Sequence, residues 1–94
     1  MRVRWLRRAV VDLDDAEAYI ARDNPSAASG IVEKIVRAVT LLKEQSGLGR
    51  SGRVPGTKEL IVPGTPYIVP YRVKDDTIQV LRVYHTSRKW PNRL

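Results

Sequence analysis

Asn24 and Pro25 interrupt a helical pattern of apolar residues and divide it into two parts. From Arg7 onward, apolar residues recur every three or four positions, as on the buried face of an amphipathic helix, at Ala9, Leu13, Ala16 and Ile20. A residue that precedes proline is disfavoured in the helical conformation, so this helix should end near Asp23. Asn24 can cap a second helix, and Pro25 suits its first position. Two helices with so short a connection predict an antiparallel hairpin.

The second helix has a wider apolar stripe, formed by Ala28, Ile31, Val32, Ile35, Val36, Ala38, Val39 and Leu42. Gly30 lies inside this pattern, where glycine costs about 1 kcal/mol relative to alanine. We therefore expect another element to approach the helix closely at Gly30. Gly47 and Gly49 are expected to end the helix.

The remaining sequence predicts strands. Val3 and Trp5 alternate with arginines in an N-terminal strand, and three more strands are predicted after the loop from Gly47 to Gly56, at 58–62, 67–73 and 78–85. Pro63-Gly64 suits the centre of a type II turn. Pro70 has no N–H group, so its strand should bulge there or present that position to an unpaired edge. The order predicts an α+β fold, with the N-terminal strand and a three-stranded antiparallel segment in one sheet that the helical hairpin covers.

Length and composition limit the possible functions. Ninety-four residues suffice for one small domain, so residues 1–94 are expected to form a single unit. The chain has no cysteine and one histidine, His85, which argues against a disulfide framework, a structural zinc site or a His-paired nucleophile, and we expect no metal or cofactor. The N-terminal region lacks an apolar run long enough for a signal peptide or membrane span, so we expect a cytoplasmic protein without a membrane partner.

The net charge of +7 is unevenly distributed along the chain. Residues 1–46 contain eight Lys/Arg and seven Asp/Glu, whereas residues 47–94 contain nine and three. The C-terminal half is therefore expected to carry a basic face for an acidic partner, either nucleic acid or an acidic protein segment.

Four carboxylates lie in the N-terminal half of the first helix, at Asp12, Asp14, Asp15 and Glu17. We interpret them as favourable partners of the helix dipole. The alternative is a catalytic acidic pair, but no histidine or further carboxylate accompanies them in the sequence to divide the acid and base roles. The Gly47–Gly56 loop lacks the Gly-Lys-Ser/Thr ending of a phosphate loop, although its Arg50 and Arg53 can contact a partner.

Several short motifs occur in an order that resembles the RelE/ParE superfamily of bacterial toxins, and its ParE branch most closely. They are Leu13 to Tyr19, Asp23-Asn24-Pro25 with Ala27-Ala28, Gly49-Arg50, Gly52-Arg53, Thr57-Lys58-Glu59-Leu60, the strand runs TPYIVPYRV and TIQVLRVYHT, and the ending Arg88-Lys89-Trp90-Pro91. The resemblance covers nearly the whole chain. It implies a toxin of a type II toxin-antitoxin system, with a cognate antitoxin as partner and DNA contacted mainly through that antitoxin.

Toxins of this superfamily either cleave messenger RNA on the ribosome or inhibit DNA gyrase. In the RNA-cleaving branch the resemblance implies a Tyr-Arg-Leu-Val-Tyr strand whose arginine assists phosphoryl transfer. The corresponding run here is Tyr67-Ile68-Val69-Pro70-Tyr71, so Ile68 replaces the arginine. This substitution favours a gyrase inhibitor that acts by binding, with no catalytic residue of its own.

The candidate partner-binding residues are six of the nine cations of the C-terminal half and one aromatic residue: Arg50, Arg53, Lys58, Arg72, Arg82, Arg88 and Trp90. An acidic, amphipathic antitoxin segment would suit them. The alternative is a ribosome-dependent endoribonuclease with His85, Arg72, Arg82 and Arg88 as its catalytic set. A sequence-independent nucleic-acid binder and an inactive toxin also stay open, and the sequence leaves the oligomeric state undetermined.

Overall fold

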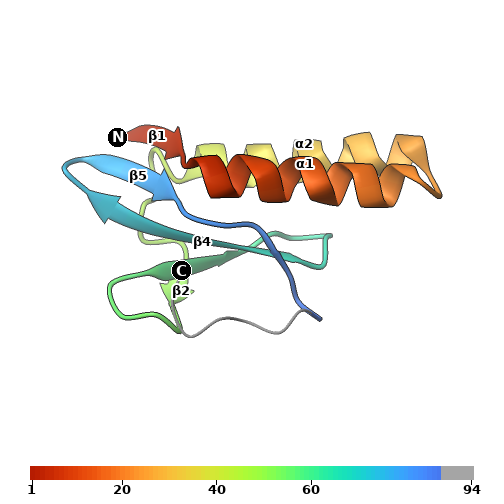
Figure 1. Cartoon of the computed structure of the whole chain (residues 1–94). Helices are drawn as coiled ribbons and strands as arrows, with labels where there is room; N and C mark the ends of the chain where they lie inside the picture. Colours follow the sequence, from red (N-terminus) through yellow and green to blue (C-terminus); the bar gives the residue numbers. More distant parts are fainter. Residues whose placement is uncertain (88–94) are drawn as a thin grey trace.

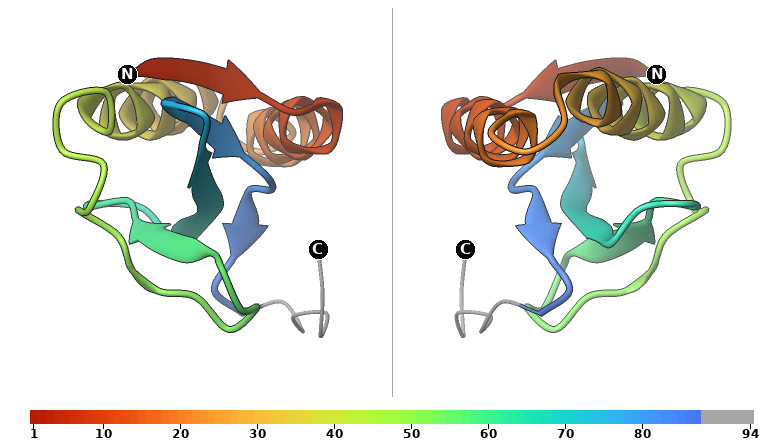
Figure 2. Two further views of the ribbon diagram at one scale, coloured as in Figure 1. Left: turned by 90° about the vertical axis from the view of Figure 1, so that its left-hand side faces the viewer. Right: turned by 90° about the vertical axis from the view of Figure 1, so that its right-hand side faces the viewer.

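The computed structural model of the chain describes residues 1–87 and places two helices against one sheet (Figure 1). The elements are β1 (Arg2–Trp5), α1 (Arg7–Ala21), α2 (Pro25–Leu41), β2 (Arg50–Ser51), β3 (Lys58–Ile61), β4 (Tyr67–Lys74), β5 (Thr77–Val80) and β6 (Tyr84–His85). Figure 2 shows both helices end-on, on the same side of the sheet. The predicted α+β fold is confirmed.

The sheet is mixed, with strand order β1-β5-β4-β3-β2 and β6 paired with β4. Strands β2 to β6 pair with one another only in antiparallel fashion, whereas β1 pairs with β5 in parallel. Parallel neighbours need a long crossover connection, and the helical hairpin with the intervening strands supplies it. After the antiparallel strands β2 to β4, the chain thus places β5 beside the N-terminal strand β1.

Local signals set the break between the helices. The Asn24 side chain accepts a hydrogen bond of 3.1 Å from the Ala27 N–H, and Pro25 is the first residue of α2. The apolar stripes face the sheet as predicted, with Ala9, Ala16 and Ile35 in the core. None of the helices in residues 1–87 is both long enough and apolar enough for a transmembrane segment.

Two predictions about α2 are wrong. The helix ends at Leu41, because Lys43 and Glu44 donate to the carbonyls three residues before them and begin a series of tight turns ahead of the glycines. Gly30 has no close neighbour either, since a Cβ built there would meet no atom within 4 Å. The glycine is therefore not required by packing.

The predicted turn at Pro63-Gly64 forms as expected, and a second tight turn joins β4 to β5. Gly64 has a φ of 73°, and the Thr65 N–H donates to the Val62 carbonyl at 3.3 Å, which matches a type II turn. Asp75 and Asp76 have φ values of 51° and 57° and join β4 to β5 as a two-residue hairpin. Two successive positive φ values give a type I′ turn, whose twist matches that of the flanking strands.

Pro70 interrupts the sheet, but the extra residue lies in the neighbouring strand. Tyr71 pairs with Val80 and Ile68 pairs with Tyr84, so two residues of β4 face three residues of the segment 81–83. The Leu81 N–H donates to the Pro70 carbonyl at 2.9 Å, which shows that the missing N–H of Pro70 would have pointed to this same side. The ladder along β4 is therefore interrupted between its pairing with β5 and its pairing with β6, where proline offers no donor.

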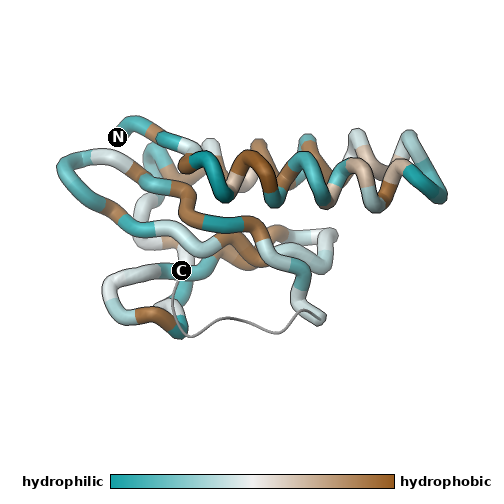
Figure 3. Tube along the Cα trace, in the orientation of Figure 1, coloured by the Kyte–Doolittle hydropathy of each residue, from teal (hydrophilic) through white to brown (hydrophobic). Residues whose placement is uncertain are grey.

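The core lies between the helical hairpin and the sheet. Ile35, Leu42, Tyr71, Ile78 and Val80 are fully buried there, and hydrophobic residues recur along both helices and the strands beneath them (Figure 3). Val80 and Val83 both belong to this core. In a regular strand, residues three positions apart point to opposite faces of the sheet. The extra residue at 81–83 therefore turns Val83 inward.

Candidate functional site

Four arginines line a pocket of about 470 Å³ where α1 begins. We call it the basic pocket, and its lining residues are Leu6, Arg7, Arg8, Val54, Pro55, Gly56, Thr57, Arg72, Leu81 and Arg82. It brings together Arg72 and Arg82, both predicted from the sequence to contact a partner. Sequence reasoning missed Arg7 and Arg8, although the run MRVRWLRR has four arginines and no acidic residue.

Arg82 is held by Asp12 of α1. Its Nε and Nη2 atoms donate to the two carboxylate oxygens at 2.7 and 3.0 Å, and the Val83 N–H donates to the same carboxylate at 2.9 Å. The hydrogen bond with Asp12 raises the pKa of the Arg82 guanidinium. Asp12 thereby fixes the 81–83 segment to the helix. The first turn of α1 contains no acidic residue, so the helix-dipole interpretation of Asp12 is replaced by this ion pair.

Arg50, Arg53 and Lys58 lie at the other edge of the sheet, around the buried carboxylate of Glu59. The Arg53 N–H donates to Glu59 at 2.8 Å and the Arg50 guanidinium at 3.3 Å. Glu59 is only 3% exposed, so these bonds compensate its burial. Lys58 is the neighbouring residue of β3, paired with Ser51 and Tyr71.

The Gly47–Gly56 loop is fixed to the core through Tyr71. The Tyr71 hydroxyl donates to the Ser46 carbonyl at 2.8 Å and accepts from the Gly49 N–H at 2.9 Å. A Cβ at Gly49 would lie 2.7 Å from the Tyr71 ring, so only glycine allows this approach. Burial raises the pKa of the Tyr71 phenol, although the Gly49 hydrogen bond opposes the shift.

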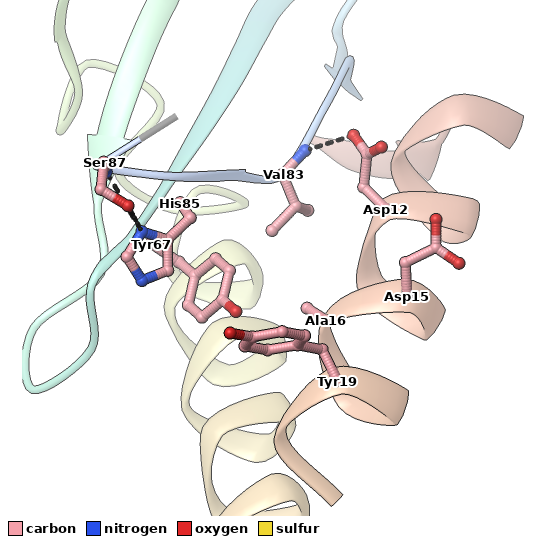
Figure 4. Close-up of a pocket in the computed structure, with 8 residues that line it drawn as sticks. All are labelled: Asp12, Asp15, Ala16, Tyr19, Tyr67, Val83, His85 and Ser87. Atoms are coloured by element: carbon pink, nitrogen blue, oxygen red, sulfur yellow. Dashed lines mark hydrogen bonds between the residues drawn. The ribbon is translucent and has the colours of Figure 1, made fainter. Parts of the chain in front are cut away.

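His85 lines a different cavity, of about 530 Å³, between α1 and the end of the sheet (Figure 4). We call it the acidic pocket, and its lining residues are Asp12, Asp15, Ala16, Tyr19, Tyr67, Val83, His85 and Ser87. His85 contacts Tyr67 edge-on, with ring centroids 5.3 Å apart, and its Nδ1 accepts from the Ser87 N–H at 3.1 Å. Arg72 and Arg82 do not line this pocket.

Ile68 is buried in β4, with an exposure of 5%. It pairs with Ile61 on one side and Tyr84 on the other, so the position holds hydrocarbon. The predicted contact residues Arg88 and Trp90 lie outside the described residues. Within residues 1–87 no group of three or more metal-ligating side chains occurs.

These surfaces belong to a recognisable fold. The family model described as the ParE toxin of the type II toxin-antitoxin system parDE matches residues 3–90. The chain belongs to this ParE toxin family. It is 43% identical over 93 residues to a putative toxin, Y4kP, of Sinorhizobium fredii, covering 99% of this chain and 96% of that protein.

Other relatives of this ParE toxin carry both branch names. Toxin RelE2 of Caulobacter vibrioides is 30% identical over 86 residues, covering 92% of this chain and 96% of its own length. Among solved structures, the chromosomal ParDE system of P. aeruginosa matches with a TM-score of 0.81 and 35% identity, covering 90% of this chain and 95% of that one. The RelBE2 toxin-antitoxin complex of Mycobacterium tuberculosis matches with a TM-score of 0.56 and 28% identity, covering 89% and 95%.

Proposed function

We propose that this ParE-family toxin inhibits DNA gyrase by binding it, so that cleaved DNA accumulates, and that a cognate antitoxin neutralises the toxin. The observation that carries the proposal is the buried Ile68, at the position where the RNA-cleaving branch uses an arginine. Without a metal, RNA cleavage requires activation of a 2′-hydroxyl and stabilisation of the charge that develops on the phosphate. A buried isoleucine does neither.

The surroundings of His85 also argue against a nuclease. Its pocket is lined by the carboxylate of Asp15, which repels the phosphate that a nuclease must hold, and by Asp12, whose charge Arg82 compensates. The two described arginines of the alternative catalytic set, Arg72 and Arg82, line the basic pocket instead. The described part of that set is therefore divided between two cavities. Inhibition of gyrase would take place in the bacterial cytoplasm.

A gyrase supercoiling reaction tests the proposal. Addition of the purified toxin is expected to trap gyrase on cleaved plasmid, so that linear DNA is seen once gyrase is denatured. His85→Ala is expected to retain this effect, because the histidine performs no chemistry. Unchanged gyrase activity, together with cleavage of ribosome-bound messenger RNA that His85→Ala abolishes, would instead establish the endoribonuclease.

An antitoxin partner is supported by the similar solved structures, which are a ParDE toxin-antitoxin system and a RelBE2 toxin-antitoxin complex. On this chain the basic pocket offers cations beside the apolar side chains of Leu6, Pro55 and Leu81. Such a surface suits an amphipathic segment with acidic residues, because it satisfies both the charge and the apolar contact. Arg50, Arg53 and Lys58 extend the predicted contact to the opposite sheet edge.

Charge reversal in the basic pocket tests this docking. Arg7→Glu, Arg8→Glu and Arg72→Glu together are expected to weaken antitoxin binding at moderate salt in a calorimetric titration. Arg82 is left intact because it also holds Asp12. Arg22→Glu with Arg37→Glu, on the exposed helix surface, serves as the control. An unchanged affinity of the pocket variant would refute the docking.

A further inference from the structure

Strands β1, β5 and β4 bring four cations into two adjacent rows. Arg2 is in register with Thr77, which is in register with Lys74. Arg4 is likewise in register with Gln79, and Gln79 with Arg72. Side chains in register on neighbouring strands point to the same face, and positions two residues apart on one strand share it. Arg2, Arg4, Arg72 and Lys74 therefore form one surface, which we call the basic strand face.

This face is opposite the core. The alternate residues Val3, Trp5, Ile78, Val80 and Tyr71 pack into or against the buried cluster under the helices. All four cations are exposed, and Arg72 donates to the Gln79 side chain at 2.6 Å. The two rows contain Arg, Lys, Thr and Gln, and no apolar side chain. These residue types contact phosphate and sugar groups in nucleic-acid complexes.

The N-terminus of α1 continues the same positive surface. Arg7 and Arg8 occupy its first turn, where the positive end of the helix dipole makes cations unfavourable. No side chain caps this end, because Leu6 is the N-cap residue. A bound anion would offset this repulsion, because the N-terminal N–H groups of the helix and both arginines would then interact with negative charge. Two exposed carboxylates, Asp75 and Asp76, form the turn at the opposite end of the face, and Asp75 lines the cavity shared by Arg2, Arg4 and Lys74.

We propose that the basic strand face binds the phosphate backbone of duplex DNA without reading its sequence. Cations two residues apart on a strand are separated by roughly 6.6 to 6.8 Å, about two base-pair rises along one DNA strand. The absence of apolar side chains in the rows disfavours an amphipathic peptide, which the basic pocket suits better. The choice of DNA over RNA rests on the proposed function, because DNA is the substrate of gyrase.

Fluorescence anisotropy with a labelled 20-base-pair DNA duplex tests the proposal. The intact chain is titrated between 50 and 200 mM salt, without gyrase. Contacts by Arg7 and Arg8 would steepen the log–log salt slope further, and the four phosphate contacts of the basic strand face alone predict about −3.6. Arg2→Gln with Arg4→Gln removes two of them, so the slope is expected to become shallower by about 1.8. Both arginines are exposed on an edge strand, so the variant is expected to fold, and its circular dichroism melting curve is the check.

The control variant carries Arg22→Gln with Arg37→Gln, which lowers the net charge equally but lies on the helices. It is expected to keep the slope of the wild-type chain. Equal losses in both variants would show attraction by net charge alone and overturn the proposal, as would a slope near zero. Tighter binding of an RNA duplex of the same sequence would overturn the assignment to DNA.

The assay separates this inference from the proposed function. If the Arg2/Arg4 variant still inhibits gyrase while the wild-type chain shows no salt slope in DNA binding, only the DNA contact is refuted. Salt-dependent DNA binding by a chain that leaves gyrase unaffected refutes only the gyrase proposal.

Discussion

Removing the Asp12 carboxylate should destabilise the fold more than any other single change of an acidic residue in α1. Asp12 accepts two hydrogen bonds from Arg82 and one from the Val83 N–H, across a sequence separation of about 70 residues. Its side chain is 9% exposed and that of Arg82 is 21% exposed. Asp12→Ala therefore leaves a backbone donor and a half-buried guanidinium without their acceptor.

The expected loss is about 3 kcal/mol. A hydrogen bond to a charged group contributes about 1.5–3 kcal/mol, and a buried donor left unsatisfied costs about 1–3 kcal/mol. The guanidinium can turn toward water after the substitution, so the two contributions do not add in full. A domain of this size has a stability of roughly 5–14 kcal/mol. The melting temperature should fall by about 12–24 °C.

Urea unfolding followed by circular dichroism measures the effect. Asp14→Ala, on the exposed side of the same helix, is the matched control and should change stability by less than about 0.5 kcal/mol. A cycle with Arg82→Ala should give a coupling energy of about 1.5–3 kcal/mol. A coupling below about 0.5 kcal/mol, or equal losses for Asp12→Ala and Asp14→Ala, would refute the reasoning.

Three further predictions use the same unfolding assay. Gly30→Ala should stabilise the chain by about 0.5–1 kcal/mol, because the site is helical and open; a loss of stability would contradict this. Gly49→Ala should destabilise it by about 1–3 kcal/mol, because the new Cβ would meet the buried Tyr71 ring at 2.7 Å; a neutral result would show that the loop moves freely. Burial raises the pKa of Tyr71, so the unfolded chain loses this proton first, and stability should fall as pH rises from about 10 toward the folded pKa. Tyr71→Phe should reduce that slope, and an identical slope in both proteins would exclude Tyr71 as its source.

The sequence predicts most of the fold because its decisive signals are local. The cap at Asn24, the turn at Pro63-Gly64 and the interruption at Pro70 each depend on one or two residues. Periodicity then assigns the buried faces. What local patterns cannot supply is the partner of each strand, and so the parallel pairing of β1 with β5 was not predicted.

The candidate surfaces were predicted less completely for the same reason. Arg72 and Arg82 were identified from their charge, but the pairing of Arg82 with Asp12 joins positions that no sequence window contains together. Arg2 and Arg4 were counted in a half of the chain with almost balanced charge. They become part of a basic surface only because β1 lies beside β5.

Pro70 connects the architecture to the proposed function. Its missing N–H interrupts the ladder along β4 between β5 and β6, and the extra residue of segment 81–83 turns Val83 into the core. Arg82, the residue before it, reaches Asp12 and the basic pocket. Beyond the break, His85 pairs with Tyr67 and lines the acidic pocket. An uninterrupted strand would place Arg82 on the same face as the buried Ile78 and Val80, where a guanidinium has no polar partner. The break thus lets Arg82 form its ion pair with Asp12, while His85 lines the acidic pocket.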